Sequence, residues 1–245
     1  MCLPPSHRSA REAGVTLVEL LITLVVSSIM VAAIFAAYMM VDRQYDKLSA
    51  VAELHQNGRS ALGLMVRDIR QAGYLAFGSS ALDGGVNVVA ITDCAGPLGP
   101  SVTSTSGCGR SDQITLIYDQ DTNARFRISY WVQVIGGGRG QLRTTKQTCT
   151  DALMTVCANI YQNQLIADGV EDLQFVGRQA LNINANNDPV IVDVELILRT
   201  NNEYQLTANW TSPSSAAGNG RLTAIDGAVR EVFQQTVLVR NLAYQ

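Results

Sequence analysis

Residues 20–41 form an uncharged apolar run that limits the possible folds of this chain more than any other feature. The 22 residues carry only Thr23, Ser27 and Ser28 as polar interruptions. As a helix they would rise about 33 Å, against roughly 30 Å for the hydrocarbon core of a bilayer. A helix in a globular protein alternates polar and apolar faces, and this run does not. We therefore predict a membrane-spanning helix over residues 15–41.

The charges that flank this run predict its orientation. Arg8 and Arg11 precede it, and Glu12 offsets them only in part. Beyond the run the charges balance, in the order Asp42, Arg43, Asp46 and Lys47. Because excess positive charge marks the cytoplasmic side, the N-terminus is expected in the cytoplasm and most of the chain beyond the membrane.

One carboxylate, that of Glu19, lies just inside the start of the apolar segment. An unpaired charge in hydrocarbon costs roughly 2.5–3.5 kcal/mol on insertion scales. One interpretation is a glutamate that snorkels to the interface by chance. The other is a glutamate with a cationic partner, which a carboxylate in low dielectric needs.

The sequence around Glu19 resembles the type IV prepilin signal, also called the class III signal. "AGVTLVELL" follows that pattern, with a basic leader that ends at Gly14 and a glutamate at the fifth position counted from Val15. The family usually has phenylalanine in the place of Val15. The resemblance implies that a prepilin peptidase removes residues 1–14 and that Val15 is N-methylated. It also implies that Glu19 pairs with the amine of a neighbouring subunit and so sets the assembly register.

Four of the five cysteines lie beyond the apolar run, and Cys2 lies in the leader. An even set outside the cytoplasm predicts two disulfides formed in an oxidising compartment. Three connectivities are possible, and we favour the two local pairs, each of which lies in a Gly-, Ser- or Thr-rich stretch: Cys94–Cys108 and Cys149–Cys157. A zinc site is the alternative, but the chain has no Cys-x-x-Cys and only two histidines.

Residues 42–73 continue the helical pattern, now with one apolar face. Small and apolar residues recur at steps of three and four, namely Val51, Leu54, Gly58, Ala61, Leu62, Met65, Ile69 and Ala72. Gly73 is typical of a helix C-terminus. The sequence therefore predicts one helix from about Val15 to Ala72, the second half of which packs against a sheet.

Residues 74–245 are expected to form a β-rich periplasmic head. Segments rich in Val, Ile, Thr and aromatic residues, several with period-two alternation, are typical of strands, and they cover residues 86–92, 112–119, 125–135, 190–200 and 231–241. Polar loops are expected at residues 95–111 and 211–220. A helix followed by strands predicts an α+β, pilin-like fold with the helix on an antiparallel sheet.

Three later stretches resemble PilW-type minor pilins and together cover about a fifth of the chain. They are "QNGRSALGLMVRDIRQAGY" (residues 56–74), "IADGVEDLQFVGR" (166–178) and "REVFQQTVLVRN" (230–241). The resemblance implies a non-enzymatic protein without cofactor that primes or caps a type IV pilus. Its expected partners are the prepilin peptidase, other minor pilins, the major pilin, the inner membrane and a tip adhesin.

Other functions fit the sequence less well. A J-type pseudopilin of a type II secretion system shares the same leader and helix. A DNA-uptake pilin is disfavoured by the net charge of −3, which becomes one unit more negative without the leader. A membrane-anchored enzyme would need a catalytic cluster, and no nucleophile set stands out.

The glycines at residues 136–140 predict a hairpin tip, and residues 119–123 and 182–189 predict polar turns more readily than calcium loops.

Processing provides the first test of this interpretation. Mass spectrometry of protein from membranes that contain active prepilin peptidase should show Val15 as an N-methylated first residue. Gly14→Leu should keep the leader, because a large side chain next to the cut would not enter a site built for glycine. An intact leader on the unaltered protein would contradict the prepilin assignment.

Overall fold

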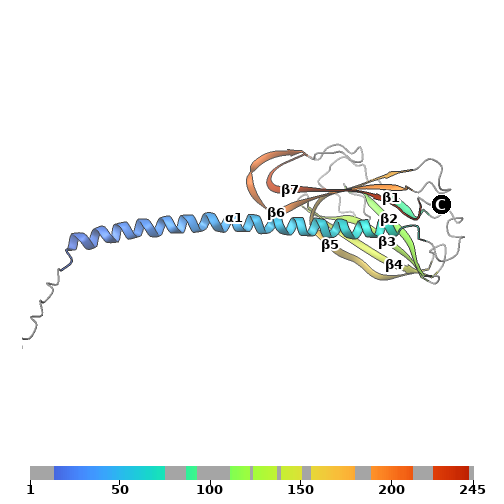
Figure 1. Ribbon diagram of the computed structural model, residues 1–245, viewed down its shortest axis with the longest axis horizontal. Helices are drawn as coiled ribbons and strands as arrows, with labels where there is room; N and C mark the ends of the chain where they lie inside the picture. Colours follow the sequence, from blue (N-terminus) through green and yellow to red (C-terminus); the bar gives the residue numbers. More distant parts are fainter. Residues whose placement is uncertain are drawn as a thin grey trace, which may run out of the picture. The chain divides into compact units, whose positions relative to one another are not determined.

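The computed structural model describes residues 14–74, 87–92, 111–121, 124–136, 139–150, 156–179, 189–211 and 223–242. The chain divides into two compact units, Met1–Ser49 and Ala50–Gln245, and we call the second the head unit. A 55-residue helix, α1 (Leu17–Gln71), begins in the first unit and ends in the head unit. Figure 1 labels α1 and the strands that follow it.

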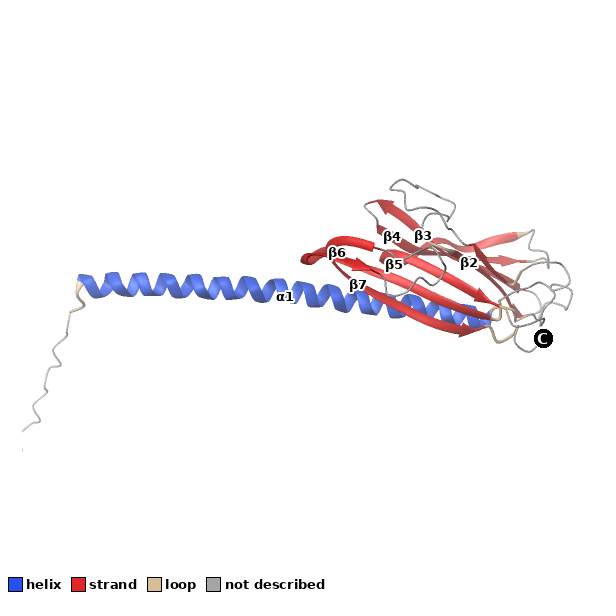
Figure 2. Cartoon of the chain, turned by 90° about the horizontal axis from the view of Figure 1, so that it is seen from above, coloured by secondary structure: helices blue, strands red, loops and turns tan. Residues whose placement is uncertain are grey.

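The strands of the head unit form one seven-stranded sheet in which each strand pairs antiparallel with the next (Figure 2). Chain order and sheet order are therefore the same. The strands are β1 (Val89–Thr92), β2 (Gln113–Asp121), β3 (Ala124–Gly136), β4 (Arg139–Cys149), β5 (Cys157–Arg178), β6 (Ile191–Thr211) and β7 (Thr223–Leu238).

β5 joins two parts of this sheet. Its first half pairs with β4 and its second half pairs with β6. Gly169 lies at the change with a φ of +72°, and a Cβ there would lie 2.6 Å from the carbonyl oxygen of Arg199. Only glycine fits such a position without strain. In the second half of β5, which β4 does not pair with, the carbonyl oxygen of Leu173 accepts from the backbone N–H of Asp112 at 2.8 Å, so the chain just before β2 contacts β5 directly.

The hydrophobic core lies between the last turns of α1 and the sheet. The helix contributes Leu54, Ala61, Leu62, Met65, Val66 and Ile69, and the sheet contributes residues such as Leu116, Ile128, Leu142, Leu173, Val192, Leu196 and Val237. Fully burying one such side chain is worth about 1.5–3 kcal/mol. The helical spacing of the apolar face predicted from residues 51–72 is therefore what attaches the helix to the sheet.

One polar contact lies inside this interface. Asp68 of α1 is only 1% exposed, and the hydroxyl of Tyr130 on β3 donates to its Oδ2 at 2.6 Å. Arg67 donates to the other carboxylate oxygen at 3.0 Å. Burial, reinforced by the nearby Asp68 carboxylate, raises the pKa of Tyr130, so its hydroxyl stays protonated and remains a donor. The buried carboxylate thus has partners from both the helix and the sheet.

The predicted α+β fold with an antiparallel sheet is confirmed, but two of its strands were not predicted. The five predicted segments correspond to β1, β2, β3, β6 and β7. β4 was missed because it is rich in Thr, Gln and Arg, with Leu142 as its one large buried aliphatic residue. β5 was missed because an exposed Asn- and Gln-rich stretch and Gly169 interrupt its alternation. β6 also runs to Thr211, beyond the predicted end at residue 200.

Two glycines of α1 provide a matched test of this packing. A Cβ on Gly58 would lie 2.3 Å from the ring of Phe233, whereas a Cβ on Gly63 would meet nothing within 4 Å. Gly58→Ala should destabilise the head by about 1–3 kcal/mol because the ring must move. Gly63→Ala should stabilise it by about 0.5–1 kcal/mol through helix propensity alone. Thermal unfolding of the full chain in detergent measures both, and equal stabilisation would contradict this close contact.

Candidate functional site

The segment that precedes α1 carries the predicted cleavage position. Gly14, Val15 and Thr16 are exposed and lie outside the helix, which begins at Leu17. A Cβ added to Gly14 would meet no atom within 4 Å, and Val15 is 70% exposed. Both sides of the predicted cut are therefore accessible in this structure.

Thr16 caps the first turn of α1, a role that was not predicted from the sequence. The backbone N–H of Glu19 donates to Thr16 Oγ1 at 3.3 Å, and the N–H of Leu20 donates to the carbonyl oxygen of Thr16 at 3.2 Å. Thr-x-x-Glu is the spacing of a capping box, and it is visible in the sequence. Glu19 also lies where a negative charge favours the helix dipole. The position of Glu19 in the first turn therefore favours the start of the helix, apart from any role in assembly.

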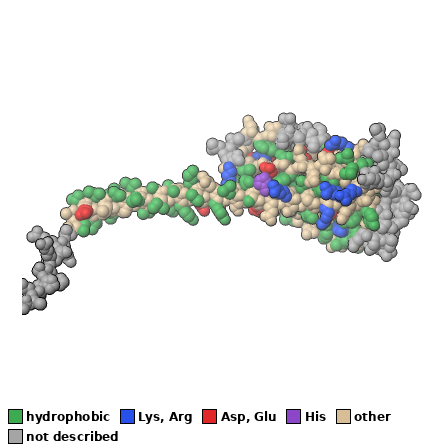
Figure 3. All heavy atoms as spheres, viewed as in Figure 1, with side chains coloured by type: hydrophobic (Ala, Val, Ile, Leu, Met, Phe, Trp, Pro, Cys, Tyr) green, Lys and Arg blue, Asp and Glu red, His purple; other side chains and the backbone are tan. Residues whose placement is uncertain are grey.

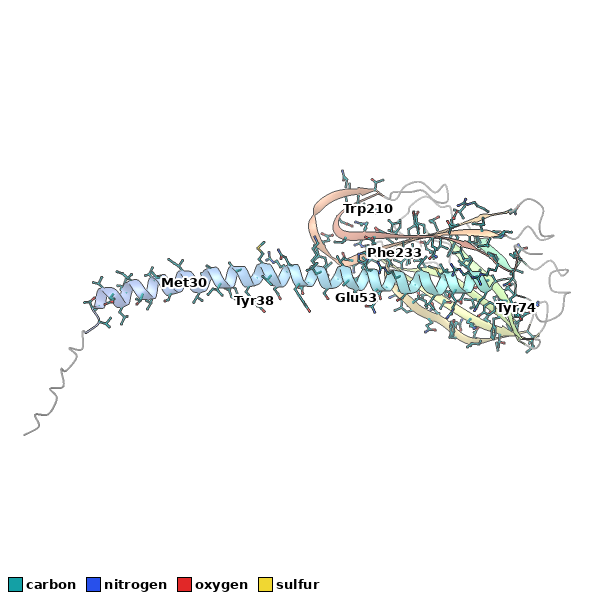
Figure 4. The ribbon with its side chains drawn as sticks, viewed as in Figure 1. Met30, Tyr38, Glu53, Tyr74, Trp210 and Phe233 are labelled. Atoms are coloured by element: carbon teal, nitrogen blue, oxygen red, sulfur yellow. A yellow bond between two sulfur atoms is a disulfide. The ribbon has the colours of Figure 1, made fainter. Side chains whose placement is uncertain are left out.

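The surface of α1 before the head unit is apolar and uncovered. Every residue from 17 to 46 is exposed, and an 18-residue window has a mean hydropathy of 2.6, with none of it buried. The hydroxyls of Thr23, Ser27 and Ser28 donate to carbonyl oxygens three residues earlier, at 2.9, 3.0 and 2.7 Å. Hydrophobic side chains cover this segment in Figure 3, and Met30 and Tyr38 project outward in Figure 4. By length and composition the helix can cross a membrane.

Two of the stretches that resemble PilW-type minor pilins contact each other where β7 lies along α1. The Phe233 ring, whose position is labelled in Figure 4, fits against Gly58. The His55 ring meets the Phe233 ring edge-on, with 6.2 Å between centroids. His55 is thus a helix-face residue in contact with the sheet. The end of the helix is also held, since Asn241 Nδ2 donates to the carbonyl oxygens of Gln71 and Ala72 at 3.2 and 3.1 Å. Asn241 thereby satisfies carbonyls that a helix C-terminus leaves without partners.

A buried ion pair joins the PilW-like stretch at residues 230–241 to the one at residues 166–178. Arg230 of β7, with a side chain 1% exposed, donates from Nε to Glu171 Oε2 of β5 at 2.5 Å. Arg230 also pairs with Asp226 at 2.6 Å, and Arg199 of β6 lies 3.4 Å from Asp226. The ring of Trp210 lies 5.3 Å from the Arg230 guanidinium. The three stretches thus form one structural unit, which the sequence suggested only through their common resemblance.

The predicted pair Cys149–Cys157 is present as a disulfide with 4.1 Å between the Cα atoms. The two cysteines lie opposite each other at the end of the β4–β5 ladder. The disulfide therefore joins two neighbouring strands and closes the connection between them. Cys94 and Cys108, the other predicted pair, lie outside the described residues.

Three further sequence motifs are the glycine-rich stretch, the acidic turn and the Asn-rich turn, and the structure describes the first two in part. The glycine-rich stretch at residues 136–140 connects β3 to β4, which pair up to Gly136 and Arg139. Asp119, the first residue of the polar turn predicted at residues 119–123, lies instead in β2, is 1% exposed and is bonded to Arg125 at 2.7 Å. Residues 182–188 lie outside the described part of the chain.

Comparison with known proteins locates the similarity at the N-terminus. Residues 9–35 match the prokaryotic N-terminal methylation motif. With the long apolar helix and the antiparallel head, this match indicates a type IV pilin-like protein that is structural in nature. Such a protein is processed by a prepilin peptidase and has pilin partners, and the apolar helix is consistent with membrane anchoring. No curated protein and no solved structure matches the chain.

The ion cluster around Arg230 predicts an acid-dependent loss of stability. The hydrogen bond from Arg230 lowers the pKa of Asp226 from 3.8 to about 2. A depressed carboxyl pKa stabilises the fold above the unfolded value, and this contribution is lost as the pH falls toward the folded value. Asp226→Asn should therefore cost about 1.5–3 kcal/mol at neutral pH, and the difference from the unaltered protein should shrink between pH 4 and 2.

Asp193→Asn is the matched control for this measurement. Asp193 accepts from Arg178, whose side chain is 60% exposed. Losing this exposed ion pair should therefore lower the free energy of unfolding by less than about 1 kcal/mol. Denaturant unfolding at several pH values would give both differences. A cost for Asp226→Asn that does not change down to pH 2 would contradict the lowered pKa.

Proposed function

We propose that this chain is a PilW-like minor pilin that primes a type IV pilus or lies at its tip. The observation that supports the proposal most is the combination of a prepilin-type start with an apolar helix exposed along its whole first part. An exposed apolar surface of this size requires lipid or other apolar helices to cover it. The three PilW-like stretches, which join helix and sheet in the head unit, support the assignment to this branch.

The proposed topology follows the order of the chain. Residues 1–14 are the leader, residues 15–41 cross the inner membrane, and residues 42–73 form the amphipathic part of the helix. Residues 74–245 form the head, in the periplasm before assembly and at the cell surface afterwards. The excess of arginine before the apolar run and the disulfide Cys149–Cys157 support this orientation.

Assembly would proceed through packing of the apolar helix against other pilins. Cleavage after Gly14 creates an amine on Val15, which is mostly cationic at neutral pH. In a bundle of low dielectric, this amine and the Glu19 carboxylate of a neighbour would each need a partner of opposite charge. The pair would therefore penalise any register in which the two groups do not meet. Thr16, by capping the helix, holds the first turn that carries Glu19.

A deletion strain distinguishes this proposal from its closest alternative. Loss of a minor pilin should sharply reduce the number of surface fibres and leave type II secretion intact, and the wild-type gene should restore the fibres. Loss of a J-type pseudopilin should instead block type II secretion and leave the number of surface fibres normal. Normal fibres together with blocked secretion would overturn the pilus assignment while retaining the pilin-like class.

Two substitutions of Glu19 test the proposed register pair. Glu19→Val removes both the charge and the side-chain oxygen that a capping box uses at this position, whereas Glu19→Gln keeps such an oxygen and removes only the charge. Both variants should fail to restore surface fibres or crosslinks to partner pilins, because the Val15 ammonium loses its counter-charge. Cleavage after Gly14 and the thermal transition of the head should be unchanged in both.

Glu53→Gln is the control, since Glu53 is an exposed glutamate on the same helix. It should restore normal fibre numbers. Normal fibres with Glu19→Gln but not with Glu19→Val would show that Glu19 acts by capping alone. Normal fibres with both variants would show that Glu19 has no role in assembly.

A further inference from the structure

The two sulfurs of the disulfide lie in different environments. Cys149, the last residue of β4, is 0% exposed. Cys157, the first residue of β5, is partly exposed and follows Val156, which is 64% exposed. A reagent in solution therefore reaches the Cys157 side of the bond first.

A guanidinium group is held beside the more accessible sulfur. Arg127 Nη2 donates to Cys157 Sγ at 3.5 Å. Arg127 Nε donates to Gln147 Oε1 at 2.8 Å, and Gln147 Nε2 donates to Asn159 Oδ1 at 2.8 Å. These three residues lie opposite one another on β3, β4 and β5. A chain of amide hydrogen bonds across the sheet thus fixes the position of the Arg127 side chain.

The charges around the two cysteines also differ. Arg125 lies opposite Cys149 in the β3–β4 register, but its charge is balanced by Asp119 at 2.7 Å. Within the described part of the chain, Arg127 forms no salt bridge with a carboxylate. A cation without a paired anion favours the thiolate form of a nearby cysteine, and the thiolate is the nucleophile in disulfide exchange. Position and charge therefore both favour Cys157 over Cys149 as the reactive thiol.

We propose that Cys157 is the residue at which a protein thiol–disulfide oxidoreductase oxidises the head. The Cys157 thiolate attacks the disulfide of the oxidoreductase, forms a mixed disulfide and releases one thiolate of that enzyme. Cys149 then loses its proton and attacks Cys157 Sγ, and the second thiolate of the enzyme leaves. The two thiols of the head are oxidised, and the disulfide of the enzyme is reduced to a dithiol by two electrons and two protons.

The same asymmetry would protect the finished bond. A reducing thiolate can reach Cys157, but attack there must expel Cys149 as a thiolate into a buried position. Burial disfavours the charged form of the leaving group. Attack at Cys149 would expel the stabilised Cys157 thiolate, but Cys149 is not accessible. This inference goes beyond the proposed pilin function and depends on it only for the oxidising location of the head.

The test uses the reduced full chain in detergent, with oxidised glutathione as the disulfide probe. Peptide mass mapping counts glutathione on each cysteine separately, which accounts for Cys2, Cys94 and Cys108. Cys149→Ser should form the mixed disulfide at Cys157 much faster than Cys157→Ser forms it at Cys149. Competitive alkylation of the reduced chain without substitutions should label Cys157 before Cys149, and this measurement does not depend on the folding of a variant.

The role of Arg127 is tested in the Cys149→Ser chain. Arg127→Gln should move the midpoint of the pH–rate profile of Cys157 upward. The reaction at neutral pH should then slow by about threefold if the midpoint rises by one pH unit. Arg127→Lys should restore most of the rate, and Arg143→Gln, on β4, should have no effect. Faster labelling of Cys149, or an unchanged profile with Arg127→Gln in a chain that keeps its thermal transition, would overturn the proposal.

Discussion

The head depends on the contact between the last turns of α1 and the sheet, with β7 lying along the helix. Small residues allow this close approach. Gly58 leaves room for the Phe233 ring, and Ala61 and Ala72 are fully buried. Asn241 then satisfies carbonyls at the end of the helix, where Gly73 adopts a φ of +77°. Without the helix, the apolar face of the sheet would be open to water, so the sheet cannot be considered separately from α1.

Several buried charged groups of the head have partners on another element. Asp68 links the helix to β3, Asp119 pairs with Arg125 across β2 and β3, and Arg230 links β7 to β5. Such pairs are costly to bury and costly to break, so they favour one arrangement of the strands over others. Glu19 differs from these groups because it is exposed in the single chain. Its partner in the proposed assembly would come from another subunit.

The two units of the chain differ in whether their apolar residues are buried within the unit or exposed. In the described part of the head unit, apolar side chains form one buried core, and buried ion pairs such as Asp119–Arg125 and Glu171–Arg230 have both partners within the unit. The first part of α1 presents apolar residues along its length, and its polar side chains bond within the helix. A pilin-like protein combines such a packed head with an apolar helix that other helices or lipid must cover. The disulfide adds a further local restraint, between the last residue of β4 and the first residue of β5.

The sequence by itself determined the features that depend on nearby residues. These are the apolar run at residues 20–41, the amphipathic face of residues 51–72, the stop at Gly73 and five of the strands, and the sequence also favoured the local pair Cys149–Cys157 among three possible connectivities. Each is set by spacing over a few turns or a short loop. The Thr16–Glu19 capping box is equally local and was overlooked, although its spacing is visible in the sequence.

Only the tertiary structure decided the features that join distant residues. β4 and β5 are strands because of the neighbours with which they pair, and their own composition does not predict them. Glu171 and Arg230 are 59 residues apart, and Asn241 is 170 residues from the carbonyl of Gln71 that it caps. The difference in exposure between Cys149 and Cys157, and the position of Arg127 beside one of them, also arise from strand register. The physical reason is that burial and the pairing of charges are properties of the packed chain, which local spacing cannot specify.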